Sequence, residues 1–168
     1  MKKINLFTIA FILILTGSLN TSCIAQGKGV AVSGLVAKPY TINAETFAAM
    51  KRITVPVTGH DGAAHQYSGV SLYEILTKAQ AVPDKQLKGK MMTKYLLITA
   101  ADNYQVVIAM PEFDPAFTDA VILLADEQDG EKLPANLGPY RLVVPKDKRQ
   151  ARSVMRVTSI EVKDANPL

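Results

Sequence analysis

Four of the seven residues in the segment 146–152 are Lys or Arg, and one is Asp. An Arg side chain can hold a phosphate through two parallel hydrogen bonds, and the backbone N–H groups of a loop can strengthen that grip. The segment lies between two strand-like stretches, so we expect a loop, and loops carry function more often than the scaffold does. Two interpretations stay open, an anion-binding loop and a solvated connection. The four cations are Lys146, Lys148, Arg149 and Arg152.

Two histidines offer a second candidate site. His60 and His65 flank the sequence DGAA, and Asp61 is adjacent to His60. Their spacing matches neither HExxH nor a Cys/His zinc pattern. Both lie in a stretch rich in Gly and Ala, so we expect a solvated loop in preference to a metal site.

Signatures of nucleophilic and nucleotide chemistry are missing. The sequence contains no GxSxG, GxGxxG or GxxxxGK[ST] pattern, and its only cysteine is Cys23. Carboxylates are numerous between residues 112 and 131, where we expect turns and solvated side chains. They are Glu112, Asp114, Asp119, Asp126, Glu127, Asp129 and Glu131.

The first residues have the composition of an export signal. Lys2 and Lys3 precede an apolar run of about ten residues, 6–15. Such a run is too short to span a bilayer as a helix, which takes about 20 residues. We therefore expect residues 1–25 to be a signal peptide and the protein to be exported and periplasmic.

The end of the leader allows two forms of processing. Small residues at Cys23 and Ala25 favour cleavage before Gln26. That cleavage leaves residues 26–168 as a single domain. The alternative is a lipoprotein anchored through Cys23, and only then do we expect a membrane contact.

The positive charge is modest once the leader is set aside. The whole chain has a formal net charge of +4, but Lys2 and Lys3 belong to the leader, so seventeen Lys and Arg face fifteen Asp and Glu in residues 26–168. No aromatic residue is interleaved with the cations of 146–152. A nearly neutral domain without a stacking surface is not a nucleic-acid-binding protein.

Two short helices are predicted. Asn43 is a suitable N-cap for AETFAAM, and Ser71 with Glu74 forms a capping box at the start of SLYEILTKA. Apolar residues of the second helix recur at helical spacing, which indicates one face packed against a sheet. These residues are Leu72, Ile75, Leu76 and Ala79.

Strand signals dominate the remainder. Turns are expected at Asp102-Asn103 and Asp129-Gly130, and strict alternation would place Val154 and Arg156 on one face of the last strand. Many strands with few helices and no regular βαβ order favour a mixed, β-rich α+β fold. The expected strands cover 30–36, 53–58, 95–100, 105–110, 121–126, 141–145 and 154–162.

Three stretches resemble, in order, parts of the sulfite oxidase-like molybdopterin-binding domain family. VSGLVAKPYTINAETFAAM resembles its opening segment, and YSGVSLYEILTKAQAV is similar to its pattern W.Gv.L.dlL. The C-terminal part of the family reads G.P.RLvvP and G.RSVKW. It is similar to LGPYRLVVPKDKRQARSVMRVTSIEV together with the preceding DPAFTDAVILLADEQDGEKLP. The resemblance covers nearly all of residues 26–168. It implies a mixed α+β fold, a molybdopterin cofactor and an exported oxidoreductase.

The resemblance also implies a cofactor site in the basic tail, where the family holds the pterin and its phosphate. Arg141, Arg152 and Ser153 match positions of that tail. Lys148 and Arg149 lie in the same loop, and the histidine loop would lie beside the cofactor. The cofactor-binding residues expected on this basis are Arg141, Lys148, Arg149, Arg152, Ser153 and His60.

The tail departs from the family pattern in two places. Met155 and Arg156 stand where the family has Lys and Trp, so one cation is displaced by one residue. The glycine-rich approach to the pterin is replaced by KDKRQA, which is bulkier and more charged. We therefore do not expect the close backbone contact with the pterin that the family's glycines allow there.

The metal ligand of the family has no counterpart. The family holds molybdenum through a Cys in a C.GN-like turn, and the nearest match, VTGH, places Val57 there. A valine side chain has no lone pair, and residues 26–168 contain no Cys. We therefore expect no catalytic residue, no thiolate ligand to a metal and no sulfite-oxidase-type oxygen transfer. A bound molybdenum would be held by the pterin dithiolene, with His60 and Asp61 left open as further ligands.

Two hypotheses about function stay open. The first is a redox protein that binds molybdopterin through the basic tail. The second is a non-catalytic module that kept the fold and binds another phosphorylated cofactor, a small anion or a protein partner.

Overall fold

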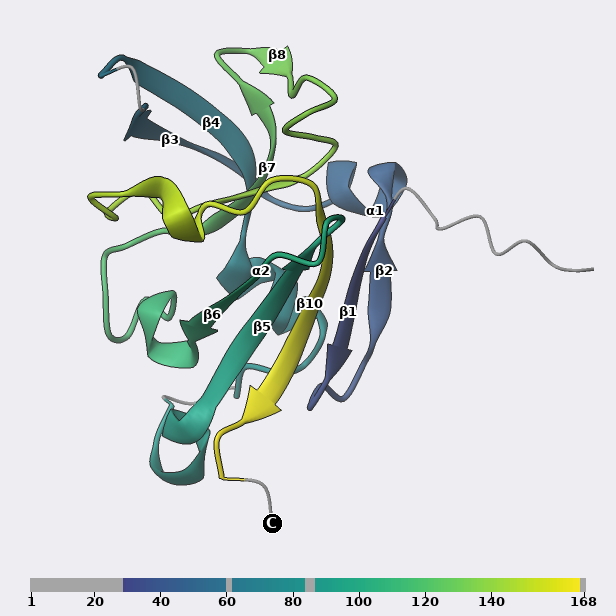
Figure 1. Ribbon diagram of the computed structural model, residues 1–168. Helices are drawn as coiled ribbons and strands as arrows, with labels where there is room; N and C mark the ends of the chain where they lie inside the picture. Colours follow the sequence, from purple (N-terminus) through teal and green to yellow (C-terminus); the bar gives the residue numbers. More distant parts are fainter. Residues whose placement is uncertain (1–28, 60–61, 84–86, 167–168) are drawn as a thin grey trace, which may run out of the picture.

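The computed structural model describes residues 29–59, 62–83 and 87–166. The expected signal peptide and His60 lie outside these residues. Within them, ten strands alternate with two short α-helices and three 3-10 helices (Figure 1). The β-rich α+β fold expected from the sequence is confirmed.

The first sheet has the strand order β2–β1–β10–β5–β6. β1 and β10 run parallel, and the other neighbours are antiparallel. The last strand therefore lies in the centre, beside the first one (Figure 1). The bounds are β1 Val30–Gly34, β2 Tyr40–Ile42, β5 Lys94–Ala100, β6 Gln105–Ala109 and β10 Val157–Asp164.

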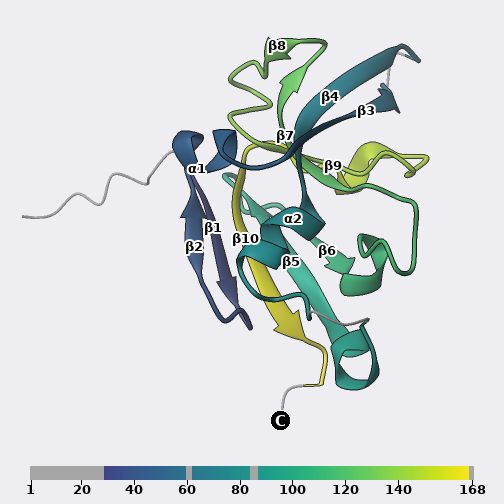
Figure 2. The same cartoon turned by 180° about the vertical axis from the view of Figure 1, so that it is seen from behind.

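The second sheet is antiparallel and has the order β3–β4–β7–β8, with β9 also paired to β7. It stands at one end of the first sheet, as both views show (Figures 1 and 2). The bounds are β3 Arg52–Thr58, β4 Ala64–Ser71, β7 Leu123–Gln128, β8 Glu131–Lys132 and β9 Arg141–Val143.

Both α-helices begin at the predicted caps. Asn43 Oδ1 accepts a hydrogen bond from the Thr46 N–H at 2.7 Å, and Ser71 Oγ accepts one from the Glu74 N–H at 3.1 Å. Each cap satisfies a backbone donor that the first helical turn leaves unpaired, a contribution of about 1 kcal/mol. The helices are α1 Ala44–Ala48 and α2 Leu72–Lys78, and the 3-10 helices are η1 Gly89–Thr93, η2 Met110–Glu112 and η3 Gln150–Arg152.

The main core lies between α2 and the first sheet (Figure 2). Leu72, Ile75 and Leu76 of α2 are fully buried together with Ile98 and Ile160 of the sheet. Each such side chain stabilises the fold by about 1.5–3 kcal/mol. A smaller apolar cluster belongs to the second sheet and consists of Val57, Tyr67, Leu123, Ala125, Leu133 and Val143.

Three expectations from the sequence were wrong, and the first concerns β4. His65 lies in this eight-residue strand, opposite Val57 of β3, and not in a loop. The stretch AHQYSGVS has few β-formers, so its own sequence does not predict a strand. Pairing with β3 on one side and β7 on the other imposes the extended conformation.

The second concerns the start of the last strand. β10 begins at Val157, and Arg156 has a left-handed backbone conformation with φ +49°. The register shifts between Val157 and Ser159. As a result Val154 and Val157 are buried while Arg156 is exposed, so the strict alternation fails there.

The third concerns the carboxylates. Asp114 is buried, and its Oδ1 accepts a hydrogen bond from the Ala116 N–H at 2.8 Å. Asp126 and Glu127 lie on β7 and form ion pairs. These three have hydrogen-bond or ion-pair partners in the protein, so they are not the freely solvated turn residues that the sequence predicted.

Gly69 permits the close approach of β4 to β7. A Cβ atom at Gly69 would clash with the backbone carbonyl oxygen of Leu124. We predict that Gly69→Ala lowers the free energy of unfolding by about 2–3 kcal/mol, because two backbones must separate. Urea denaturation measures the loss. Gly130→Ala is the control, since its Cβ meets no atom within 4 Å and only the left-handed backbone opposes it; an equal loss in both would contradict the prediction.

Candidate functional site

Arg141 is a buried cation on β9. Its position is set by β7, because Ala125 pairs with Arg141 on one side and with Gly69 of β4 on the other. The guanidinium donates from Nη1 to Tyr67 Oη at 2.8 Å and from Nη2 to Gln150 Oε1 at 2.7 Å. Its Cζ lies 5.1 Å from the centre of the Tyr67 ring. Only 8% of the residue is exposed.

The positive charge of Arg141 has no negative partner among the residues that the structure describes. Among the described residues no carboxylate is ion-paired with it, and its Nε is buried without a hydrogen-bond partner. A buried Arg is normally paired, because removing an isolated charge from water is costly. The unmatched charge therefore favours an anion beside Arg141.

Arg141 lines a hollow of about 390 Å³ between β4, β9 and η3. On its far wall His65 Nδ1 lies 2.7 Å from Asp129 Oδ2. The Gln66 N–H and then the His65 ring, both hydrogen-bonded to the Asp129 carboxylate, lower the pKa of Asp129. The polar lining of this hollow consists of His65, Tyr67, Gln128, Arg141, Gln150 and Ser153.

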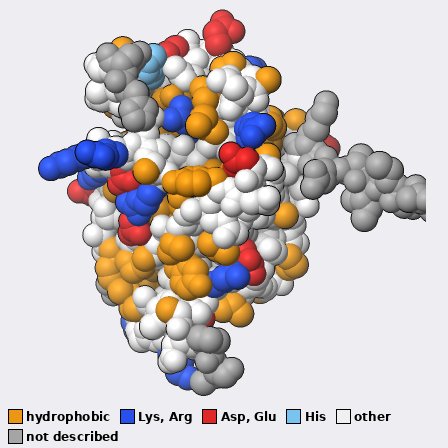
Figure 3. All heavy atoms as spheres, in the orientation of Figure 1, with side chains coloured by type: hydrophobic (Ala, Val, Ile, Leu, Met, Phe, Trp, Pro, Cys, Tyr) orange, Lys and Arg blue, Asp and Glu red, His pale blue; other side chains and the backbone are white. Residues whose placement is uncertain are grey.

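A second hollow of about 510 Å³ adjoins the first. It lies between Thr58 and Gly59, at the end of β3, and the loop 147–151, which includes the exposed Lys148 and Arg149. Both hollows are lined by Gly59 and Gln150. Lys and Arg side chains project from the molecule at the place of this loop (Figure 3). The sequence-predicted residues Arg141, Lys148, Arg149 and Ser153 thus surround two adjoining hollows.

Arg152 differs from the other cations of the loop. Its Nε and Nη2 donate to the two oxygens of Asp147, each at 2.8 Å, and its Nη1 donates to Glu112 Oε2 at 2.7 Å. The hydrogen bonds to Asp147 and then Glu112 raise the pKa of Arg152. Its donors fasten the loop to η2, so its position suits a structural role.

Ser153 also has a partner in the protein. Its Oγ accepts a hydrogen bond from the Val144 N–H at 3.1 Å, and the residue is buried. The bond joins the end of η3 to the chain that follows β9. Ser153 therefore shapes the wall of the first hollow, while His60 lies outside the described residues.

The described residues hold no cluster of three His, Cys, Asp or Glu side chains suited to a metal ion. Val57 is 7% exposed and packs in the apolar cluster of the second sheet. An apolar environment of this kind would raise the pKa of a thiol placed there. The residues present thus fit an anionic group, and the position of Val57 does not fit a metal ligand.

Three site residues have no signal in the sequence. Tyr67, Gln128 and Gln150 are neutral polar residues, and their contribution depends on which side chains the strands bring together. Tyr67 reaches Arg141 across β7, and Gln150 Nε2 donates to the Thr58 carbonyl oxygen at 2.9 Å.

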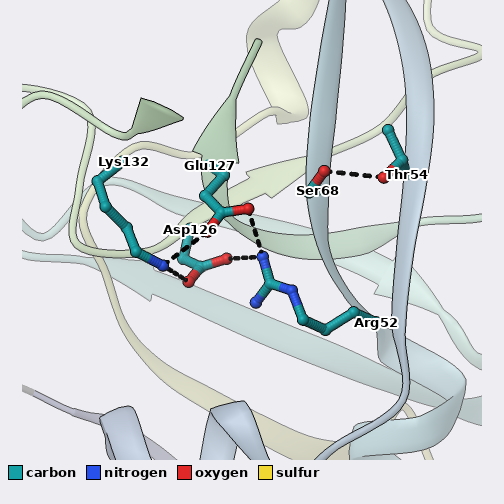
Figure 4. A network of polar contacts seen from close by, with 6 residues as sticks. All are labelled: Arg52, Thr54, Ser68, Asp126, Glu127 and Lys132. Carbon is teal, nitrogen blue, oxygen red and sulfur yellow. Dashed lines mark hydrogen bonds and ion pairs between the residues drawn. The ribbon is translucent and has the colours of Figure 1, made fainter. Parts of the chain in front are cut away.

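A separate group of charges joins β3, β7 and β8 of the second sheet (Figure 4). Arg52 Nη2 lies 2.7 Å from Asp126 and 2.8 Å from Glu127, and Lys132 Nζ lies at the same two distances from these carboxylates. They border a hollow of about 390 Å³ that Phe47 also lines. Two cations here balance two anions, so this hollow has no unmatched charge.

The group gives the protein a pH dependence. The hydrogen bond between Glu127 and Lys132 is the main reason why the pKa of Glu127 lies below the ordinary value of 4.5. A lowered pKa contributes stability above pH 4.5 that is lost as the pH falls through the folded-state value. We predict a lower midpoint of urea denaturation at about pH 3.5 than at about pH 6. Lys132→Gln should reduce this difference, and an unchanged difference would contradict the assignment.

The ion-paired Arg152 and the exposed Arg149 should respond differently to substitution by Ala, the first in stability and the second in binding. Arg152→Ala should lower the free energy of unfolding by about 1–2 kcal/mol, because a three-residue ion network is lost while 35% of the Arg152 side chain remains exposed. Arg149→Ala should change it by less than about 0.5 kcal/mol but weaken phosphate binding. Urea denaturation and calorimetric titration with phosphate measure both. If Arg152→Ala left stability intact and abolished binding, Arg152 would be a direct anion ligand.

No helix among the described residues is long and apolar enough to cross a membrane.

Comparison with known proteins agrees with the resemblance found in the sequence. The sequence profile of the oxidoreductase molybdopterin binding domain matches residues 26–167. Among solved structures, the sulfane dehydrogenase SoxCD from Paracoccus pantotrophus matches with a TM-score of 0.64 at 22% sequence identity, which shows a shared fold. The match covers 83% of this chain and 39% of that one. No curated protein matches the sequence. The chain belongs to the oxidoreductase molybdopterin binding domain family.

Proposed function

We propose that this chain is an exported domain that binds a phosphorylated molybdopterin-type cofactor and lacks sulfite-oxidase-type oxygen transfer. The observation that carries the proposal is the unmatched charge of buried Arg141 beside a hollow. A cofactor phosphate would supply the missing negative charge. Arg141 would hold it from inside the hollow, and Lys148 and Arg149 from the adjoining loop.

The protein's contribution is binding and orientation. Tyr67 orients the Arg141 guanidinium through the hydrogen bond that Arg141 Nη1 donates to its hydroxyl. The Arg152 network fixes the loop that carries Lys148 and Arg149. A bound molybdopterin would supply dithiolene sulfurs for a metal, but no thiolate of this chain would join them, since residues 26–168 contain no Cys.

Export rests on the sequence of residues 1–25. Cleavage before Gln26 releases the domain into the periplasm, whereas lipidation of Cys23 would anchor it to a membrane. Mass spectrometry of the mature N-terminus distinguishes these two forms.

The binding proposal predicts a variant that is stable but inactive in binding. Arg141→Met removes an unmatched buried charge and keeps much of the apolar stem, so thermal stability without ligand should stay the same or rise. Binding should fall by at least about tenfold, because a charge-assisted hydrogen bond contributes roughly 1.5–3 kcal/mol. Protein from a cofactor-producing host is assayed for molybdenum, pterin fluorescence and sulfite oxidation.

The expected wild-type protein contains pterin and oxidises no sulfite, and Arg141→Met contains little pterin. Arg156→Met is the matched control, since Arg156 is exposed and lines neither hollow. Absence of pterin from wild-type protein, or equal pterin in wild type and Arg141→Met, would refute the binding proposal. Sulfite oxidation by wild-type protein would refute the absence of catalysis.

A further inference from the structure

The Gln150 side chain bridges three parts of the site. Its Oε1 accepts from Arg141 Nη2 at 2.7 Å, and its Nε2 donates to the Thr58 carbonyl oxygen at 2.9 Å. One carboxamide therefore joins η3, β9 and the end of β3. Both of its polar groups are hydrogen-bonded, and the carbonyl oxygen accepts from the buried Arg141 guanidinium.

The same side chain lies where the two hollows meet. Gln150 and Gly59 line both the hollow of Arg141 and the hollow of Lys148 and Arg149. Gln150 is half-buried at the start of a three-residue 3-10 helix, so its side chain can rotate toward solvent without disturbing a strand. The Gln150 side chain therefore belongs to the walls of both hollows.

The carboxamide is a weak partner for a guanidinium. A neutral carbonyl oxygen accepts a weaker hydrogen bond from Arg than an anionic oxygen does. With Gln150 in place, Arg141 Nε is still buried without a hydrogen-bond partner, and no carboxylate among the described residues is ion-paired with the guanidinium. An oxyanion that reaches Arg141 would thus form a stronger hydrogen bond with Nη2 than Gln150 does.

The geometry points to Gln150 as a built-in, displaceable occupant of the oxyanion position on Arg141, which competes with the ligand and closes the passage between the two hollows. This inference rests on the proposed function. The ligand chemistry is an oxyanion, either free or carried by a cofactor. Its entry breaks the Gln150 bonds to Arg141 and Thr58 and opens one continuous cleft from Arg141 to Lys148 and Arg149. Gln150 thereby lowers the affinity of the site for an oxyanion and restricts the shape of the ligand that can bind there.

Two substitutions at Gln150 give effects of opposite sign. Gln150→Ala removes the competitor, so the dissociation constant for an oxyanion should fall by about three- to tenfold, as expected when one or two ordinary hydrogen bonds need not be broken. Gln150→Glu places a carboxylate against Arg141, so the dissociation constant should rise at least about tenfold. Without ligand, Gln150→Ala should melt lower than wild type and Gln150→Glu higher.

The experiment is calorimetric titration of the full mature chain, with inorganic phosphate and with a phosphorylated pterin as probes. Tighter binding of either probe to Gln150→Ala supports the inference, and the probe that binds identifies a free or a cofactor-borne oxyanion. Gln105→Ala is the matched control, because it also loses a side-chain hydrogen bond, to Thr99, but lies away from both hollows. Its dissociation constants should equal those of wild type.

The outcomes separate this inference from the proposed function. The inference fails alone if wild type binds a probe, Arg141→Met does not, and Gln150→Ala binds no more tightly than wild type. Gln150 would then support the structure of the site or contact the ligand directly. If neither wild type nor Gln150→Ala binds either probe, the proposed function fails and the inference with it. Binding only after Gln150→Ala would support both.

Discussion

The positive charge of Arg141 is the constraint on which the site depends. It is held in place by a strand that pairs with the middle of β7, and Tyr67 approaches it from the strand on the other side of β7. Three strands from separate parts of the sequence must pair before these two side chains meet. The buried charge is costly to the fold, so its position beside a hollow is best explained by a ligand that neutralises it.

The cations of this protein divide by whether a carboxylate is near. Arg52 and Arg152 each contact two carboxylates and hold segments of the chain together. Arg141 has none among the described residues, and Lys148 and Arg149 are exposed beside a hollow. Ion pairs at a surface add little stability individually, but they fix geometry. The Arg152 ion pairs position the loop that carries Lys148 and Arg149, and these two exposed cations are suited to bind.

Local signals in the sequence predicted the elements that depend on local interactions. Asn43 and Ser71 begin helices because their side chains cap neighbouring N–H groups. β4 was missed because its extended conformation comes from two partner strands, and the start of β10 was misplaced because Arg156 has a left-handed backbone. Composition identified the basic loop. It could not distinguish Arg152 from Lys148 and Arg149, because the difference depends on which cation the fold brings to Asp147 in the loop and to Glu112, forty residues earlier in the chain.

Val57 and Arg141 lie on different strands, β3 and β9, so the proposed anion site does not depend on a metal ligand at position 57. Val57 contributes to the apolar cluster of the second sheet, together with Tyr67, and Tyr67 is the residue that orients Arg141. Replacing a thiol by a valine at this place keeps the cluster packed, since free Cys itself behaves as a small hydrophobe. The apolar cluster that holds Tyr67, and through it Arg141, therefore needs no thiolate at position 57.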